Sequence, residues 1–287
     1  MIKNLVKALL PKREKNANKG TFGTLTVVGG SEKYRGAPIL SSEAALRSGV
    51  GICRLCSTEK VISAAAAHRP EIVFQPIDEN GSGAISSESF VSQMKHILKS
   101  NAILVGIGMT DCYDTEAVVG ALLSNYENTL IIDADGLNSI KTCPEKLLKA
   151  KKAPIITPHV GEMSRLTKLS ISEIKESRER VALDFSKKYN CVTVLKDSVT
   201  VVASPEGKCM TVDRENSALS KGGSGDVLSG IIASLSAQGL APYDAALCGV
   251  IIHSEAGLAA SAFMAEESVL PSDVISCLSA VFKELRS

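Results

Sequence analysis

Short apolar runs alternate with longer stretches of helical periodicity along almost the whole chain. Runs rich in Val, Ile and Leu that end at turn residues predict strands over residues 25–28, 51–55, 72–74, 102–105, 130–132, 154–156, 192–195 and 199–202. The stretches between and after them predict helices over residues 38–48, 59–68, 88–99, 115–126, 172–188, 225–237, 242–265 and 270–286. Several strands are apolar on both faces, which is typical of a parallel sheet between two helical layers. We therefore expect one α/β domain over residues 1–287, with a mostly parallel central sheet and helices on both faces.

The ends of the predicted elements also carry local signals. Ser170 and Glu173 have the spacing of a capping box at the head of the helix over 172–188.

The apolar N-terminal run is broken by Lys3 and Lys7 and has no small-residue cleavage site, which argues against a signal peptide. Since no long uncharged apolar stretch is present, we expect no membrane span and a cytoplasmic protein.

Composition and charge argue against a disordered chain and against nucleic acids or membranes as partners. Hydrophobic residues make up 45% and charged residues 22%, which fits an ordinary globular protein and not a disordered one. The net charge of +1 points to neither a nucleic acid nor a membrane surface. The absence of Trp and an aromatic content of 4% also argue against a base-stacking surface.

The eight cysteines include one C-x-x-C pair, Cys53 and Cys56. Both fall in a predicted strand, where residues three apart point to opposite faces. No second pair follows at zinc-ribbon spacing. We therefore expect buried, reduced thiols and not a metal or redox site.

The segment with the strongest chemical signal is a glycine-rich turn, Gly222-Gly223-Ser224-Gly225-Asp226, directly before an apolar helix. Glycines let backbone N–H groups approach a bulky anion, and a helix N-terminus adds partial positive charge, so the turn suits phosphate. We expect the helix dipole to keep Asp226 ionised, ready to accept a proton from a hydroxyl that attacks phosphorus. The alternative is a simple helix cap. The chain has neither a Walker-type phosphate loop nor a G-x-G-x-x-G fingerprint.

Gly223-Ser224-Gly225-Asp226 resembles the GxGD anion-hole motif of the ribokinase-like superfamily, in which the Asp activates the phosphoryl acceptor. Within that superfamily the chain resembles the nucleotide-dependent NAD(P)H-hydrate dehydratases, which repair NADH and NADPH that have been hydrated on the nicotinamide ring. The resemblance runs from about residue 10 to about residue 257 and includes segments 10–13, 19–23, 34–38, 43–51, 133–138, 156–163 and 195–200. It implies a ribokinase-like fold.

The resemblance also implies roles for individual residues. The catalytic base is Asp226, which also contacts the hydrated dinucleotide (NADHX or NADPHX) together with Ala37, Gly108, Thr110 and His159. Glu162 matches an acidic position that holds Mg²⁺ through water. The adenine nucleotide is contacted by two segments, the loop Lys196, Asp197, Ser198, Val199 and Thr200 and the turn Gly223, Ser224 and Gly225.

Three positions depart from the family pattern. Asn18 stands where the family usually has His, and Val160 replaces the second Pro of a TPHPGE segment. Thr110 replaces the last Gly of a glycine-rich turn that here runs from Gly106 to Thr110. This last change affects a predicted substrate contact and not the nucleotide site.

For several residues the sequence alone leaves a structural alternative open. Lys196 can be a solvated turn residue, and His159 a loop residue at a strand end. Asp133 and Asp135 can cap a turn, support the site, or hold Mg²⁺ indirectly. Lys33 and Arg35 can meet a substrate phosphate or simply be solvated. The remaining histidines fall within helical patterns, where we expect structural roles: His68, His96 and His253.

The resemblance implies a hydro-lyase that uses a kinase-like step. Asp226 deprotonates the ring hydroxyl, the terminal phosphoryl of ADP or ATP transfers to it with Mg²⁺ present, and phosphate is then eliminated. We also expect a homo-oligomer and a separate epimerase, because 287 residues leave no room for a fused one. One alternative is a ribokinase-like kinase that acts on a vitamin precursor or a sugar. Another is a nucleotide-binding protein without catalysis. The choice between ADP and ATP, and between NADHX and NADPHX, stays open.

Overall fold

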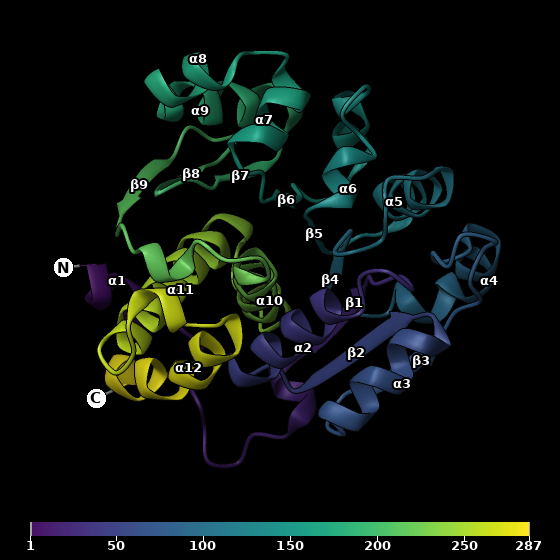
Figure 1. Ribbon diagram of the computed structural model, residues 1–287, viewed down its shortest axis with the longest axis horizontal. Coiled ribbons are helices and arrows are strands. Elements are labelled where there is room, and N and C mark those ends of the chain that lie inside the picture. Colours follow the sequence, from purple (N-terminus) through teal and green to yellow (C-terminus); the bar gives the residue numbers. More distant parts are fainter. Residues whose placement is uncertain (1, 287) are drawn as a thin grey trace.

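The computed structural model describes residues 2–286, which form a layered α/β structure around one sheet (Figure 1). The nine strands that it describes lie in the order β3-β2-β1-β4-β5-β6-β7-β8-β9. All neighbours from β3 to β7 are parallel, whereas β8 and β9 pair antiparallel. The strands are β1 Thr24–Val28, β2 Ile52–Ser57, β3 Val73–Pro76, β4 Ala102–Val105, β5 Thr129–Ile132, β6 Ile155–Ile156, β7 Val192–Leu195, β8 Val199–Ala203 and β9 Cys209–Asp213.

Helices cover both faces of the sheet, as predicted. One face packs against α1 Ile2–Leu9, α2 Gly36–Arg47, α3 Glu59–His68, α10 Ser224–Ala237, α11 Pro242–Ser261 and α12 Pro271–Arg286. The other face packs against α4 Ser87–Ile97, α5 Tyr113–Asn125, α6 Asp135–Asn138, α7 Val160–Thr167, α8 Ile171–Glu176 and α9 Arg178–Tyr189. Successive strand residues enter alternate cores, since Leu104 belongs to the first apolar cluster and Val105 to the second.

The structure departs from the sequence pattern mainly in short elements. The predicted helix over 172–188 is two helices separated at Ser177, although the Ser170–Glu173 capping box is confirmed at the head of α8. The pattern did not predict α1, α6, α7 or β9. Except for β9 these are short helices, and β9 is an edge strand with one buried residue, so none carries a long periodic signal.

The burial predicted for the C-x-x-C pair is confirmed. Cys53 and Cys56 are fully buried free thiols that face opposite cores. Burial raises the pKa of each thiol to about 12, so both stay protonated at neutral pH. Among residues 2–286, no helix combines the length and apolar character needed to span a bilayer.

The carboxyl ends of the parallel strands bring several polar residues to one edge of the sheet. Asp133 directly follows β5, His159 follows the short strand β6, and Lys196 follows β7. Helix α10 packs against α2 and the central strands, and Ser229 near its N-terminus donates a hydrogen bond to Asp133 at the same edge. Open α/β sheets bind ligands in this place, so the fold itself points to the site.

Candidate active site

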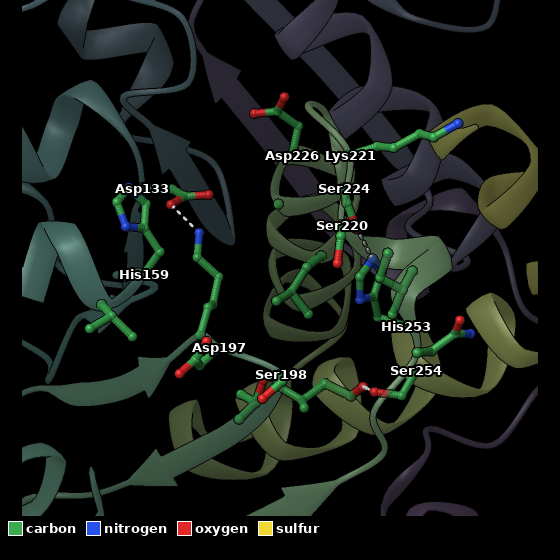
Figure 2. Close-up of a pocket in the computed structure, with 18 of the residues that line it drawn as sticks. Asp133, His159, Asp197, Ser198, Ser220, Lys221, Ser224, Asp226, His253 and Ser254 are labelled. Atoms are coloured by element: carbon green, nitrogen blue, oxygen red, sulfur yellow. Dashed lines mark hydrogen bonds and ion pairs between the residues drawn. The ribbon is translucent and has the colours of Figure 1, made fainter. Parts of the chain in front are cut away.

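A pocket of about 780 Å³ opens at this edge between the turn after β7 and the N-terminus of α10. Asp133 and His159 lie on one side of it, and Ser224 and His253 lie on the other (Figure 2). The pocket brings together most of the predicted site residues: His159, Glu162, Lys196, Asp197, Ser198, Thr200, Gly223, Ser224, Gly225 and Asp226. Four predicted residues do not line it: Ala37, Gly108, Thr110 and Val199.

The glycine turn needs glycine at specific positions. Gly223 has φ 99°, a left-handed conformation, and a Cβ there would meet Leu40 Cδ1 at 2.8 Å. A Cβ on Gly225 would lie 3.3 Å from Lys196 Nζ, whereas one on Gly222 would meet nothing within 4 Å. Gly223 therefore shapes the turn, and Gly225 lets the lysine approach the helix N-terminus.

Asp226 lies in the first turn of α10, and its backbone carbonyl accepts a 2.8 Å hydrogen bond from Ser41 Oγ on α2. Burial, together with the nearby charges of Asp133 and Asp135, raises the pKa of its carboxyl group to about 7 against the opposing effect of Lys196. The prediction that the helix dipole keeps Asp226 ionised is therefore wrong, because desolvation outweighs it. A carboxyl group that titrates near neutral pH suits a general base.

Asp133 and Lys196 form a buried ion pair, with 2.9 Å between Asp133 Oδ1 and Lys196 Nζ. The pair keeps the pKa of Asp133 low and that of Lys196 high, although burial opposes both shifts. Lys196 is thus no solvated turn residue, since its side chain is only 18% exposed. Backbone pairing between His159 and Lys196 holds the two loops together.

His159 and Glu162 form the N-terminal capping box of α7. His159 Nδ1 accepts from the Gly161 N–H at 2.9 Å, and Glu162 Oε2 accepts from the His159 N–H at 2.8 Å. Burial and the positive charge of Lys196 lower the pKa of His159, so its ring is neutral at pH 7. Burial raises the pKa of Glu162 to about 7.

A magnesium site in this pocket has to rely on few protein ligands. Among the described residues, no three His, Cys, Asp or Glu side chains gather as metal ligands. Mg²⁺ bound to a nucleotide usually keeps several waters and needs only one or two carboxylates. Glu162 fits that requirement, because the cap uses Oε2 and leaves Oε1 without a hydrogen bond, 3.6 Å from His159 Nε2.

Sequence reasoning placed His253 among the structural histidines, but it lines the pocket. Its Nε2 lies 3.2 Å from Ser224 Oγ, so α11 supports the glycine turn. Burial lowers the pKa of His253 to about 4, which keeps the ring neutral. His253 lies in α11, whereas the turn precedes α10, so no local sequence pattern indicated that the two are in contact.

Apolar side chains also line the pocket. Val212 from the unpredicted strand β9, Leu219 and Val250 form part of its wall. Asp197 at the rim accepts a 2.8 Å hydrogen bond from Arg178 Nη2, which lowers the pKa of its carboxyl group even though partial burial opposes this. The pocket therefore combines charged groups, which include Lys196 beside the glycine turn, with apolar side chains that suit a flat, weakly polar ring.

Of the three predicted substrate residues outside the pocket, Ala37 lies in the first turn of α2, and Gly108 and Thr110 lie in the loop after β4. A Cβ on Gly108 would lie 3.3 Å from Ala37 Cβ, so these two residues are adjacent. Thr110 has φ 70°, where glycine is favoured, and its N–H donates to Asp135 Oδ2 at 2.9 Å. Lys33 and Arg35 are exposed on the loop before α2 and do not line the pocket.

The profile of the NAD(P)H-hydrate dehydratase family matches residues 25–279. The chain belongs to this family. It is 33% identical over 248 residues to the ADP-dependent (S)-NAD(P)H-hydrate dehydratase of Neisseria meningitidis, a match that covers 85% of this chain and 79% of that protein. It is 35% identical to the bifunctional NAD(P)H-hydrate repair enzyme Nnr of Thermofilum pendens, over 86% of this chain and 47% of that protein.

The chain spans about half the length of the bifunctional family members that it matches. Its structure is similar to that of the ADP/ATP-dependent NAD(P)H-hydrate dehydratase of Bacillus subtilis crystallised with ATP and Mg²⁺. That comparison gives a TM-score of 0.83 and 27% identity, and it covers 99% of this chain and 97% of the other. The predicted ribokinase-like α/β fold and the predicted family are both confirmed.

Proposed function

We propose that the protein dehydrates hydrated NADH or NADPH with an adenine nucleotide as phosphoryl donor, and so restores the reduced dinucleotide. The observation that carries this proposal is the position of Asp226. A carboxyl group with a pKa of about 7 lies in the first turn of a helix whose glycine turn suits phosphate. Family membership supports the choice of substrate.

In the proposed reaction Asp226 accepts the proton of the ring hydroxyl while that oxygen attacks the terminal phosphorus. The new O–P bond forms as the bond between the terminal phosphorus and the bridging oxygen of the nucleotide breaks. This step releases AMP from ADP or ADP from ATP. The ring nitrogen lone pair then expels inorganic phosphate, the neighbouring carbon loses a proton, and the ring double bond returns. The N–H groups of the glycine turn and the Lys196 ammonium stabilise the negative charge of the transferring group.

We propose that the nucleotide lies along the pocket, with its phosphates at the glycine turn and its base against the apolar side chains Val212, Leu219 and Val250. This orientation is supported by the chemistry of the lining residues. Lys196, Asp197, Ser198 and Thr200 line the pocket, whereas Val199, the first residue of β8, does not. Gly223, Ser224 and Gly225 complete the phosphate end.

We place the hydrated dinucleotide on the other side of Asp226, against Ala37, Gly108 and Thr110. His159 faces it from the cap of α7, with Nε2 as the ring atom free of the cap's hydrogen bonds. A neutral His159 can donate from Nε2, because Nδ1 accepts the two cap bonds.

Glu162 is the residue that we propose to hold Mg²⁺, through water, beside the nucleotide phosphates. When bound, the ion would neutralise part of the phosphate charge. The raised pKa of Glu162 predicts tighter magnesium binding above pH 7, where the carboxylate is ionised. A separate epimerase, a homo-oligomeric state and a cytoplasmic location stay predictions.

Hydrated NADH, mixed with Mg²⁺ and either ADP or ATP, tests the function directly. We expect recovery of the reduced-nicotinamide absorbance with one phosphate released per dinucleotide, and faster turnover with the preferred donor. A stable phosphorylated product without absorbance recovery would identify a kinase. Tight nucleotide binding with no product would identify a binding protein.

A further inference from the structure

The carboxylate of Asp133 joins two parts of the pocket that are far apart in sequence. Its Oδ1 accepts from Lys196 Nζ at 2.9 Å and from the Ala134 N–H at 2.8 Å. Its Oδ2 accepts from Ser229 Oγ on helix α10. Since Asp133 is 2% exposed, these bonds are shielded from water and hold the carboxylate in one orientation.

Ser229 lies three residues after Asp226, which is the spacing of side chains on one helix face. The helix that carries the proposed base therefore also anchors Asp133. On the other side, Asp133 is the only described residue that accepts a hydrogen bond from Lys196 Nζ. An ammonium group has three donors, so two of them are left to face a ligand.

The Lys196 ammonium also lies against the glycine turn, 3.3 Å from the position that a Cβ of Gly225 would occupy. A flexible lysine side chain reaches that position reproducibly only if its end is fixed. A buried ion pair is a poor source of stability, because desolvation offsets most of the attraction between its charges. We therefore attribute to the Asp133–Lys196 pair the positioning of the Lys196 ammonium and not a gain in stability.

We propose that Asp133 is a positioning residue, which holds the Lys196 ammonium against the glycine turn and at a set distance from Asp226. Lys196 then faces the phosphoryl group as it transfers. The proposal rests on the proposed function, because it assigns the cation to that transfer. It also explains why the Asp133 carboxylate accepts hydrogen bonds both from Lys196 and from Ser229 on the helix that carries Asp226.

The arrangement predicts opposite changes when either partner is neutralised. The charged groups that act on Asp226 are Asp133 and Asp135, which raise its pKa, and Lys196, which lowers it. Asp133→Asn removes a negative charge and should move the Asp226 titration to lower pH. Lys196→Met removes a positive charge and should move the titration to higher pH.

The experiment compares Asp133→Asn, Lys196→Met and Ser229→Ala with the wild-type chain. A matched control is Asp114→Asn on α5, because Asp114 also accepts three hydrogen bonds, from Asn80 and Ser87, but does not line the pocket. For each variant kcat is measured against pH with hydrated NADH. Two further measurements need no turnover: ADP affinity by calorimetry and the Asp226 titration by carboxyl ¹³C NMR.

We expect Asp133→Asn to lower kcat about 100-fold, the size of effect that a misplaced catalytic group produces. ADP affinity should fall, and the acid limb of kcat and the NMR titration should both move to lower pH. Ser229→Ala keeps the charge, so it should lower kcat less and leave the titration in place. Asp114→Asn should change none of these quantities.

A wild-type kcat in Asp133→Asn would overturn the proposal. So would a lower kcat with an unmoved Asp226 titration and unchanged ADP affinity, because that result indicates a purely structural role. If Asp133→Asn does not fold, a wild-type kcat and ADP affinity in Ser229→Ala overturns it instead. If the wild-type chain does not convert hydrated NADH, the proposed function fails, while ADP affinity and the NMR titration still judge the role of Asp133.

Discussion

The groups on the two sides of Asp226 differ in charge and in size. The proposed nucleotide side consists of charged side chains, a buried ion pair and a glycine turn. The predicted substrate side consists of main-chain turns at Gly108 and Thr110, both with positive φ, next to the small side chain of Ala37. Phosphate recognition needs fixed charge, whereas a bulky ring needs room, and the two sides reflect that difference.

The largest expected effect comes from the residue between the two sides. Asp226→Asn should lower kcat about 1000-fold, because it removes the base but keeps the shape of the side chain. Nucleotide affinity should stay within a factor of about three, since the glycine turn is untouched. Asp184→Asn, an exposed carboxylate on α9, is the control. Unchanged turnover in Asp226→Asn would show that Asp226 is not the base.

The nucleotide side alone should respond to Gly223→Ala. The added Cβ meets Leu40 and Pro271 and forces a left-handed φ on alanine, so we expect about tenfold weaker ADP binding. Gly222→Ala is the matched control, because its Cβ meets open space. Equal affinities in the two variants, measured by calorimetry, would show that the turn does not bind the nucleotide.

The substrate side should respond to Thr110→Gly. Glycine adopts φ 70° without strain, and the change removes the contact of Thr110 Oγ1 with Cys112 Sγ at 3.7 Å. We expect KM for the hydrated dinucleotide to change by less than about tenfold, while ADP affinity stays constant. A change in ADP affinity instead would contradict the division into two sides.

The smallest expected effect concerns stability. The pKa of Asp226 is raised in the folded chain to about 7, from an unfolded value near 4, so folding favours the protonated form. Its ionisation therefore destabilises the fold as pH rises from about 4 through 7, and the full penalty remains above 7. Asp226→Asn should raise Tm at pH 8 by about 2 °C or more and bring no gain at pH 4. Calorimetry at the two pH values decides this, and an equal Tm difference at both would contradict the raised pKa.

The sequence predicted the larger elements because their signals are local. The run from Ala102 to Val105 and the pattern from Gly225 to Ala237 are long or apolar enough to determine strand and helix without help from neighbours. Strand β9 and helices α6 and α7 were missed, because packing stabilises such short segments more than their own residues do. Because the pattern missed β9 and α7, the sequence did not predict that Val212 lines the pocket or that His159 caps a helix.

By itself the sequence determined the α/β class, the glycine turn and the identity of the proposed base, since each depends on residues close together in the chain. The tertiary structure decided which charges meet. Asp133, Lys196 and Ser229 come from three separate elements, and His253 reaches Ser224 from another helix. It also raised the pKa of Asp226, against the expectation from the helix dipole, because desolvation and the field of distant charges depend on burial and distance in the fold, which no local pattern contains.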